Sequence, residues 1–253
     1  KEFKPQVIYT ILGNNGFMDL IELIRCRFNL PIVVHIMDDW RAASHAIGFF
    51  SPVRRRKMQR QLAHFMSVAE SCMGISDSMC NVYGAEYGRA FNTFHNGIET
   101  DAVALNPVRQ KPSNEAFRIF YAGAILPFAQ LQSIIDVCEA VADLNLQGLS
   151  VRFDIFCSPA MINLYKEKLL ICDAVHLLPP LPNREDYLSA MRNADLLLLP
   201  VNFSEDTIKF IRYSMPTKVP EMMQSGVPIL VYGPSGVAQV NYAQEHEWGY
   251  TIT

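Results

Sequence analysis

The chain has 253 residues, of which 50% are hydrophobic and 19% charged, and its net charge at pH 7 is −3. This composition is typical of a globular protein with a sizeable core, and the near-neutral charge excludes a polybasic nucleic-acid-binding protein. No apolar run approaches the ~20 residues that a bilayer-spanning helix needs, and the first residues lack the pattern of a signal peptide.

The spacing of the cysteines indicates whether the protein resides in a reducing or an oxidising compartment. There are six, and no two of them are spaced as a Cys-x-x-Cys pair: Cys26, Cys72, Cys80, Cys138, Cys157 and Cys172. Scattered cysteines are typical of buried thiols in a reducing compartment. The sequence therefore predicts a cytoplasmic protein without a metal site.

Short apolar runs recur along the chain and define the expected strands. They are Val7–Leu12, Pro31–Met37, Ser71–Ser76, Arg118–Gly123, Val151–Cys157, Ala194–Val201 and Val227–Tyr232. Each run is too continuous for a strand with one face in water, so we expect parallel strands that are covered on both sides. The segments between them have helical spacing, as in the segment after Asn183, a residue suited to cap a helix start. Alternating strands and helices predict an α/β fold.

One segment interrupts this alternation. Asn106–Ser113 (NPVRQKPS) is rich in proline and polar residues and is the best candidate for a linker. We therefore expect two domains, a first α/β domain over residues 1–105 and a second over residues 106–253.

A basic helix is expected in the first domain. The run SPVRRRKMQRQLAHFM carries Arg54, Arg55, Arg56, Lys57 and Arg60 beside apolar residues at helical spacing. Such a face suits peripheral contact with an anionic membrane or an acidic ligand, and it is equally typical of a helix face that is merely solvated.

The segment Ser214–Pro234 (SMPTKVPEMMQSGVPILVYGP) resembles the nucleotide-sugar-binding segment of GT-B glycosyltransferases, and most closely that of the retaining glycosyltransferase family 4. Four further segments resemble the same family in the same order: ESCMGISDSMCNVYGAEYG, FHNGIETD, RIFYAGAI and NREDYLSAMRNADLLLLPV. The resemblance covers nearly the whole chain. It implies two Rossmann-like domains whose parallel sheets face a central cleft. It also implies a chain truncated at both ends, without the first acceptor-domain strands and without the closing helices.

The resemblance implies a donor site for a UDP- or GDP-sugar, with no metal and no cofactor. Ser214, Met215, Pro216 and Thr217 precede a helix whose N–H groups and dipole favour a diphosphate, and Lys218 adds a cation in the opening turn. Glu221 matches the glutamate that accepts hydrogen bonds from both ribose hydroxyls. Each residue also has a plainer interpretation: Lys218 as a solvated lysine, and Glu221 as a charge that favours the helix dipole.

Two other positions belong to the expected donor site. Gly123 ends a strand at a point where the missing side chain lets the backbone approach the phosphates, although a tight turn explains it equally well. Leu181 follows a later strand that ends before Pro179, at the carboxyl edge where α/β proteins bind ligands, and is expected to line the base pocket.

The acceptor side is expected at Asp38 and Asp39, which directly follow an apolar strand. Either carboxylate, with Asp38 the first choice, is suited to position or deprotonate the hydroxyl of a saccharide or lipid-linked acceptor. Capping of the next segment is the alternative role. His35, inside the strand, is expected to be a core histidine.

The chain departs from the family at two places. Tyr213 stands where the first of two glutamates separated by seven residues is expected, and the loop Ala124–Phe128 lacks the usual arginine and lysine. Phosphate neutralisation then rests on Lys218, helped by Arg212 or Lys209. We expect a divergent transferase, one of cell-envelope polysaccharide synthesis, located in the cytoplasm or at the inner face of the membrane. A catalytically degenerate scaffold and a nucleotide-sugar epimerase are the alternatives.

Overall fold

The computed structural model describes residues 3–39, 51–98 and 115–253. The chain divides into two compact units, unit 1 (Lys1–Asn96 with Lys209–Met215) and unit 2 (Gly97–Ile208 with Pro216–Thr253). The expected linker Asn106–Ser113 and the expected domain boundary at residue 105 lie outside the described residues.

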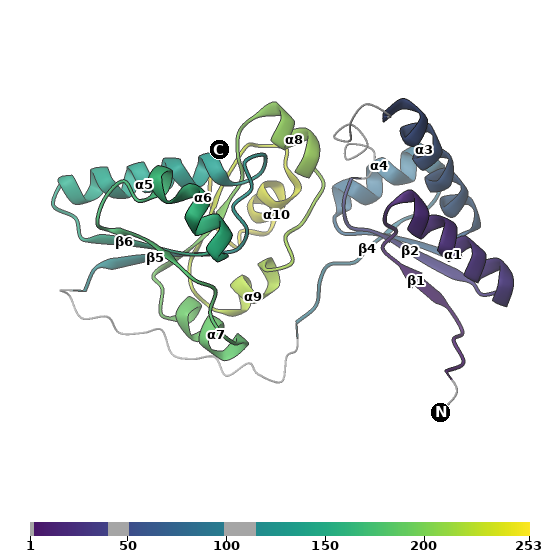
Figure 1. Cartoon of the computed structure of the whole chain (residues 1–253), viewed down its shortest axis with the longest axis horizontal. Helices are drawn as coiled ribbons and strands as arrows, with labels where there is room; N and C mark the ends of the chain where they lie inside the picture. The colour runs from purple at the N-terminus through teal and green to yellow at the C-terminus, as the bar shows by residue number, and fades with distance from the viewer. Residues whose placement is uncertain (1–2, 40–50, 99–114) are drawn as a thin grey trace. The chain divides into compact units, whose positions relative to one another are not determined.

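Unit 1 contains a four-stranded parallel sheet in the order β1-β2-β3-β4. Its strands are β1 (Ile8–Thr10), β2 (Ile32–Ile36), β3 (Ser71–Gly74) and β4 (Asn92–Thr93). Helices α1 (Asn15–Phe28), α3 (Ser51–Val68) and α4 (Asp77–Tyr87) alternate with them (Figure 1). Local signals set the ends of α4: the Ser76 hydroxyl accepts a hydrogen bond from the Met79 N–H, and Gly88 takes a left-handed conformation at the C-terminus.

Unit 2 contains a six-stranded parallel sheet in the order β10-β9-β8-β5-β6-β7. Its strands are β5 (Phe117–Ala122), β6 (Val151–Phe156), β7 (Val175–Leu178), β8 (Leu196–Pro200), β9 (Ile229–Tyr232) and β10 (Tyr250–Ile252). The chain order reverses between β5 and β8. In open α/β sheets, ligands bind beyond the carboxyl ends of the strands at such a reversal.

Six helices accompany these strands (Figure 1): α5 (Leu131–Leu146), α6 (Pro159–Leu169), α7 (Arg184–Arg192), α8 (Glu205–Ile211), α9 (Val219–Gln224) and α10 (Ala238–His246). The expected cap at Asn183 is confirmed, because its side chain accepts a hydrogen bond from the Asp186 N–H at 2.8 Å. Helix α8 contains the point at which the chain passes from unit 2 to unit 1, since the first segment of unit 2 ends at Ile208 and Lys209 belongs to unit 1.

All seven predicted strands are present, and every pair of strands in the described part of the chain is parallel. The prediction missed β4 and β10, and it included β7 only indirectly, as the strand before Pro179. All three lie at the edges of their sheets. Edge strands are often very short, and a short strand leaves a weak pattern in the sequence.

The sheet of unit 2 is covered on both faces, as the continuous apolar runs predict. On one face Tyr121 and Phe153 belong to a core cluster that includes Ile134 of α5 and Leu169 of α6. On the other face the ring of Phe120 lies 6.1 Å from that of Tyr187 in α7. Successive residues of β5 therefore serve two different layers.

The face of Phe120 also holds a buried carboxylate, Asp154 of β6. Its oxygens lie 2.7 Å from Nε of Arg152, 2.9 Å from Nδ1 of His176 and 3.7 Å from Nε of Arg118. These neighbouring strands thus supply the partners that a buried charge requires.

Candidate functional site

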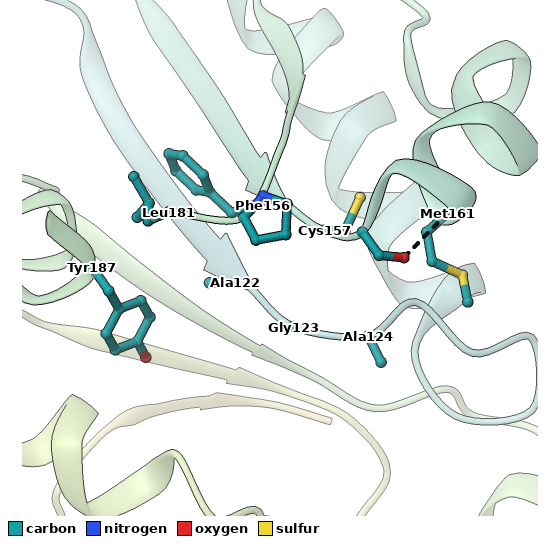
Figure 2. Close-up of a pocket in the computed structure, with 10 residues that line it drawn as sticks. Ala122, Gly123, Ala124, Phe156, Cys157, Met161, Leu181 and Tyr187 are labelled. Atoms are coloured by element: carbon teal, nitrogen blue, oxygen red, sulfur yellow. Dashed lines mark hydrogen bonds between the residues drawn. The ribbon is translucent and has the colours of Figure 1, made fainter. Parts of the chain in front are cut away.

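A pocket of about 420 Å³ lies at the carboxyl ends of β5 and β6 in unit 2 (Figure 2). Most of its wall is apolar, and residues after β7 and on α7 complete it. It is lined by Ala122, Gly123, Ala124, Phe156, Cys157, Ser158, Met161, Pro180, Leu181 and Tyr187. The position agrees with the rule for ligand sites in parallel sheets.

Gly123 forms the part of the wall directly after β5. Its φ of +155° is rarely adopted by residues with a side chain, and a Cβ here would lie 3.2 Å from the Tyr121 hydroxyl and 3.4 Å from Nζ of Lys218. The Gly123 N–H donates a hydrogen bond to the Phe156 carbonyl at 3.0 Å. A glycine therefore allows three groups, the backbone, the phenol and the ammonium, to approach one another closely.

Lys218 reaches this same point from the turn before α9. Its ammonium donates a hydrogen bond to the Ala122 carbonyl at 3.3 Å and lies 4.2 Å from the centre of the Tyr121 ring. Burial lowers the pKa of Lys218 to about 8. The interpretation of this residue as a solvated surface lysine is therefore wrong, because the side chain is directed inward beside the pocket wall.

The turn before α9 differs from the expected phosphate site. Helix α9 has only six residues, and Lys218 is its N-cap without a side-chain capping bond. A helix this short develops only part of the dipole that the sequence argument relied on. Ser214, Met215, Pro216 and Thr217 precede α9 as expected, but none of the four lines the pocket. Ser214 and Met215 belong to unit 1.

Glu221 lies on α9 with its carboxylate beside two residues of α7. Nη2 and Nε of Arg184 donate to the same oxygen, Oε1, at 3.1 and 3.3 Å. Burial and the nearby charge of Glu221 raise the pKa of Tyr187, which lines the pocket. Glu221 therefore stands at the pocket rim, next to Tyr187.

A buried network fixes the loop that follows Gly123. The side-chain nitrogen of Asn202 donates to the Pro127 carbonyl at 2.9 Å, and its side-chain oxygen accepts from the Ser133 N–H at 3.1 Å. The Thr207 hydroxyl donates to the Phe128 carbonyl at 2.7 Å. The loop without arginine or lysine is thus held by polar side chains from the segment after β8.

Several residues that the sequence singled out lie at or beside this pocket. Gly123, Leu181, Lys218 and Glu221 all lie at or beside the pocket. Phe156, Tyr187 and Arg184 were missed. A usable signal existed for Arg184 and Tyr187, because both lie in the first turn of a helix that starts just after the pocket residue Leu181.

In unit 1 the two candidate aspartates have different environments. Asp39 is buried and accepts a hydrogen bond from the Tyr83 hydroxyl at 3.0 Å. Asp38 is exposed at the carboxyl end of β2, where partial loss of solvation raises its pKa. These environments favour a structural role for Asp39 and leave Asp38 as the carboxylate suited to proton transfer.

His35 and helix α3 also belong to unit 1. His35 is buried, bonds through Nδ1 to the Tyr9 hydroxyl at 2.6 Å and has a pKa lowered by burial, as expected of a core histidine. In α3 the predicted basic residues, Arg54, Arg55, Arg56, Lys57 and Arg60, are exposed, while Leu62, Phe65 and Met66 are buried.

Within the described ranges, no helix is long and apolar enough to cross a membrane. The same residues contain no group of three or more His, Cys, Asp or Glu side chains arranged to hold a metal ion.

No family model and no curated protein matches the chain, but solved structures do. The Anabaena protein Alr3699/HepE in complex with UDP is 15% identical, with a TM-score of 0.60 over 98% of this chain and 65% of its own. WaaG, a glycosyltransferase involved in lipopolysaccharide biosynthesis, is 16% identical, with a TM-score of 0.57 over 98% of this chain and 72% of its own. A UDP-forming α,α-trehalose-phosphate synthase from Burkholderia xenovorans is 12% identical, with a TM-score of 0.63 over 98% of this chain and 62% of its own.

These similarities confirm the predicted fold. The chain has the α/β fold with parallel sheets that is found in GT-B glycosyltransferases. It spans 62% to 72% of the length of the three structures. At 12% to 16% identity the similarity establishes the fold alone.

Proposed function

We propose that the chain is a glycosyltransferase that transfers a sugar from a UDP-sugar to a saccharide or lipid-linked acceptor. One observation carries the proposal: a cation and a carboxylate lie beside two different residues that line the pocket beyond β5 and β6. Lys218 lies beside Gly123, and Glu221 lies beside Tyr187. A nucleoside diphosphate has matching parts, an anionic diphosphate and a ribose with two hydroxyls.

The choice of nucleotide rests on the similar structures. One of them was solved in complex with UDP, and another is a UDP-forming synthase. In the proposed complex the uracil base lies in the apolar part of the pocket near Leu181 and Phe156, and the ribose hydroxyls bind Glu221. GDP is the second candidate.

The proposed chemistry requires stabilisation of a leaving diphosphate. The acceptor hydroxyl forms a bond to the anomeric carbon on the face from which UDP departs, the bond from that carbon to the UDP oxygen breaks, and UDP leaves with the electron pair. The Lys218 ammonium stabilises the negative charge that develops on the phosphates. Asp38, whose raised pKa suits a general base, takes the hydroxyl proton. Retention of configuration and independence of metal are part of the proposal, on the strength of the family resemblance.

The acceptor side of the proposal draws on helix α3. Its exposed basic residues suit peripheral contact with anionic lipid at the inner face of a membrane, where lipid-linked acceptors of envelope polysaccharide synthesis are found. We accordingly place the protein in the cytoplasm.

A second function, a nucleotide-binding scaffold without catalysis, is favoured by Tyr213. This residue replaces the first glutamate of the family pattern. A scaffold retains the nucleotide site and loses turnover.

A product assay tests the proposal. The protein is incubated with a panel of UDP- and GDP-sugars and short saccharide acceptors, and nucleotide release is followed together with the anomeric proton signals of the product. Acceptor-dependent release of UDP, lost in Asp38→Asn, supports the transferase. Tight nucleotide binding without release in any combination contradicts it and supports the scaffold.

A further inference from the structure

The ion pair between Arg184 and Glu221 joins the two helices at the pocket rim. Both guanidinium donors converge on one oxygen, Oε1, at 3.1 and 3.3 Å. No hydrogen bond to the other oxygen, Oε2, occurs among the residues that the structure describes. A carboxylate oxygen accepts about two hydrogen bonds, so Arg184 occupies one oxygen and leaves the other available.

The start of α7 determines where Arg184 lies. Asn183 caps the helix by accepting from the Asp186 N–H at 2.8 Å, and its own amide group donates to the Asp186 carboxylate at 2.8 Å. Arg184 and Tyr187 are three residues apart and therefore share a face of the helix. Both are coupled to Glu221, Arg184 by hydrogen bonds and Tyr187 by the effect of the carboxylate on its pKa.

Stability does not account for this pair. The Arg184 side chain is 51% exposed and that of Glu221 is 25% exposed. Exposed ion pairs contribute little to the stability of a fold. Their geometry, in contrast, fixes the direction of a flexible carboxylate beside a pocket, which is the condition for selective recognition of hydroxyl groups.

We infer that Arg184 is a positioning residue that orients Glu221, occupies its Oε1 and reserves Oε2 for the ribose hydroxyls of the nucleotide. This inference rests on the proposed function. It assigns to Arg184 no contact with the ligand: the residue acts through Glu221, and the selectivity of the site for ribose over deoxyribose depends on it.

Calorimetry with UDP and 2′-deoxy-UDP tests the inference on the wild type, Arg184→Ala, Glu221→Ala and the double variant. We expect Arg184→Ala to weaken UDP binding about 3- to 10-fold and to reduce the preference for UDP over the deoxy compound by a similar factor. Arg184→Ala should have no further effect in the Glu221→Ala background, because the residue acts only through that carboxylate. Arg192→Ala, at the other end of the same helix, is the matched control and should bind as the wild type does.

Three outcomes overturn the inference alone, and a fourth overturns the proposed nucleotide site together with it. Unchanged or tighter UDP binding by Arg184→Ala shows that the arginine is dispensable or competes with the ribose. Additive losses in the double variant show that Arg184 contacts the ligand itself. Weaker binding of both UDP and 2′-deoxy-UDP by Arg184→Ala, with an unchanged ratio of the two affinities, shows a general structural effect. The melting temperature of the variant reports such an effect independently. If Glu221→Ala binds UDP as the wild type does, the proposed nucleotide site fails, and the inference fails with it.

Discussion

The inward position of Lys218 predicts that nucleotide binding depends on pH between 7 and 9. Its ammonium must be charged to attract a diphosphate, and burial lowers the pKa of the free protein's Lys218 to about 8. The protonated fraction is then about 90% at pH 7 and about 10% at pH 9. Phosphate groups have their second pKa near 6, so the charge of the diphosphate changes little over this range.

The size of the change in UDP affinity follows from the fraction of the protein whose Lys218 is protonated. If only the protonated form binds, the dissociation constant rises by the inverse of that fraction, which is about tenfold from pH 7 to pH 9, or about 1.4 kcal/mol. At pH 8 the complex should take up about half a proton for each nucleotide bound, because the bound diphosphate raises the pKa of the ammonium. Binding therefore weakens as pH rises through the pKa of the free protein.

Calorimetric titrations with UDP at several pH values, each in two buffers of different ionisation enthalpy, measure both quantities. Lys218→Met should bind UDP more weakly at pH 7 and show less than about a twofold change in affinity from pH 7 to 9. Lys166→Met, at an exposed lysine of α6, is the control and should keep the tenfold change. The reasoning is refuted if wild-type affinity varies less than twofold over this range, or if Lys218→Met retains the full pH dependence.

Three further predictions concern stability. Lys218 has a lower pKa in the folded than in the unfolded chain, so the unfolded state binds more protons between about pH 8 and 10.4, and the contribution of Lys218 to stability should rise with pH in that window. Lys218→Met should therefore raise the free energy of unfolding at pH 7 by about 1–3 kcal/mol. An unchanged or lower melting temperature of this variant argues against a buried ammonium. Gly123→Ala should lower the free energy of unfolding by about 1–3 kcal/mol and weaken UDP binding about tenfold, because φ at this position is +155° and the added Cβ would lie 3.2 Å from the Tyr121 hydroxyl. Wild-type stability in denaturant unfolding, or wild-type UDP affinity in calorimetry, would contradict this prediction. Asp39→Ala should cost about 1–3 kcal/mol in denaturant unfolding, since it removes a buried carboxylate and the hydrogen bond that it accepts from the Tyr83 hydroxyl, while Asp38→Asn should change stability by less than about 0.5 kcal/mol; equal losses would show that the two environments are misassigned.

Much of the fold could be predicted because its signals are local. Continuous apolar runs identified the seven strands, and Asn183 identified the start of α7. Two edge strands, β4 and β10, were missed because their sequences are short and carry weak patterns; β4, for example, consists of Asn92 and Thr93. A buried carboxylate inside β6 was not foreseen either, since its compensation by Arg118, Arg152 and His176 depends on strand order.

The candidate site was predictable where residues matched a family pattern and not where they meet through the fold. Lys218 and Glu221 were found from the segment that contains both. Arg184 is 37 positions from Glu221, and only the packing of α7 beside α9 brings them together. The effect of the helix dipole at the turn before α9 was overestimated, because α9 has only six residues and its N-cap Lys218 makes no side-chain capping bond.

The central claim is that the pocket beyond β5 and β6 binds a nucleoside diphosphate through Glu221. Calorimetry of UDP and GDP binding to the wild type and to Glu221→Ala tests it most directly, with Glu185→Ala as a control for the loss of one exposed carboxylate on neighbouring α7. We predict micromolar binding of UDP that Glu221→Ala loses and Glu185→Ala retains. Absence of binding by the wild type, or full binding by Glu221→Ala, would contradict the assignment of this pocket as the donor site.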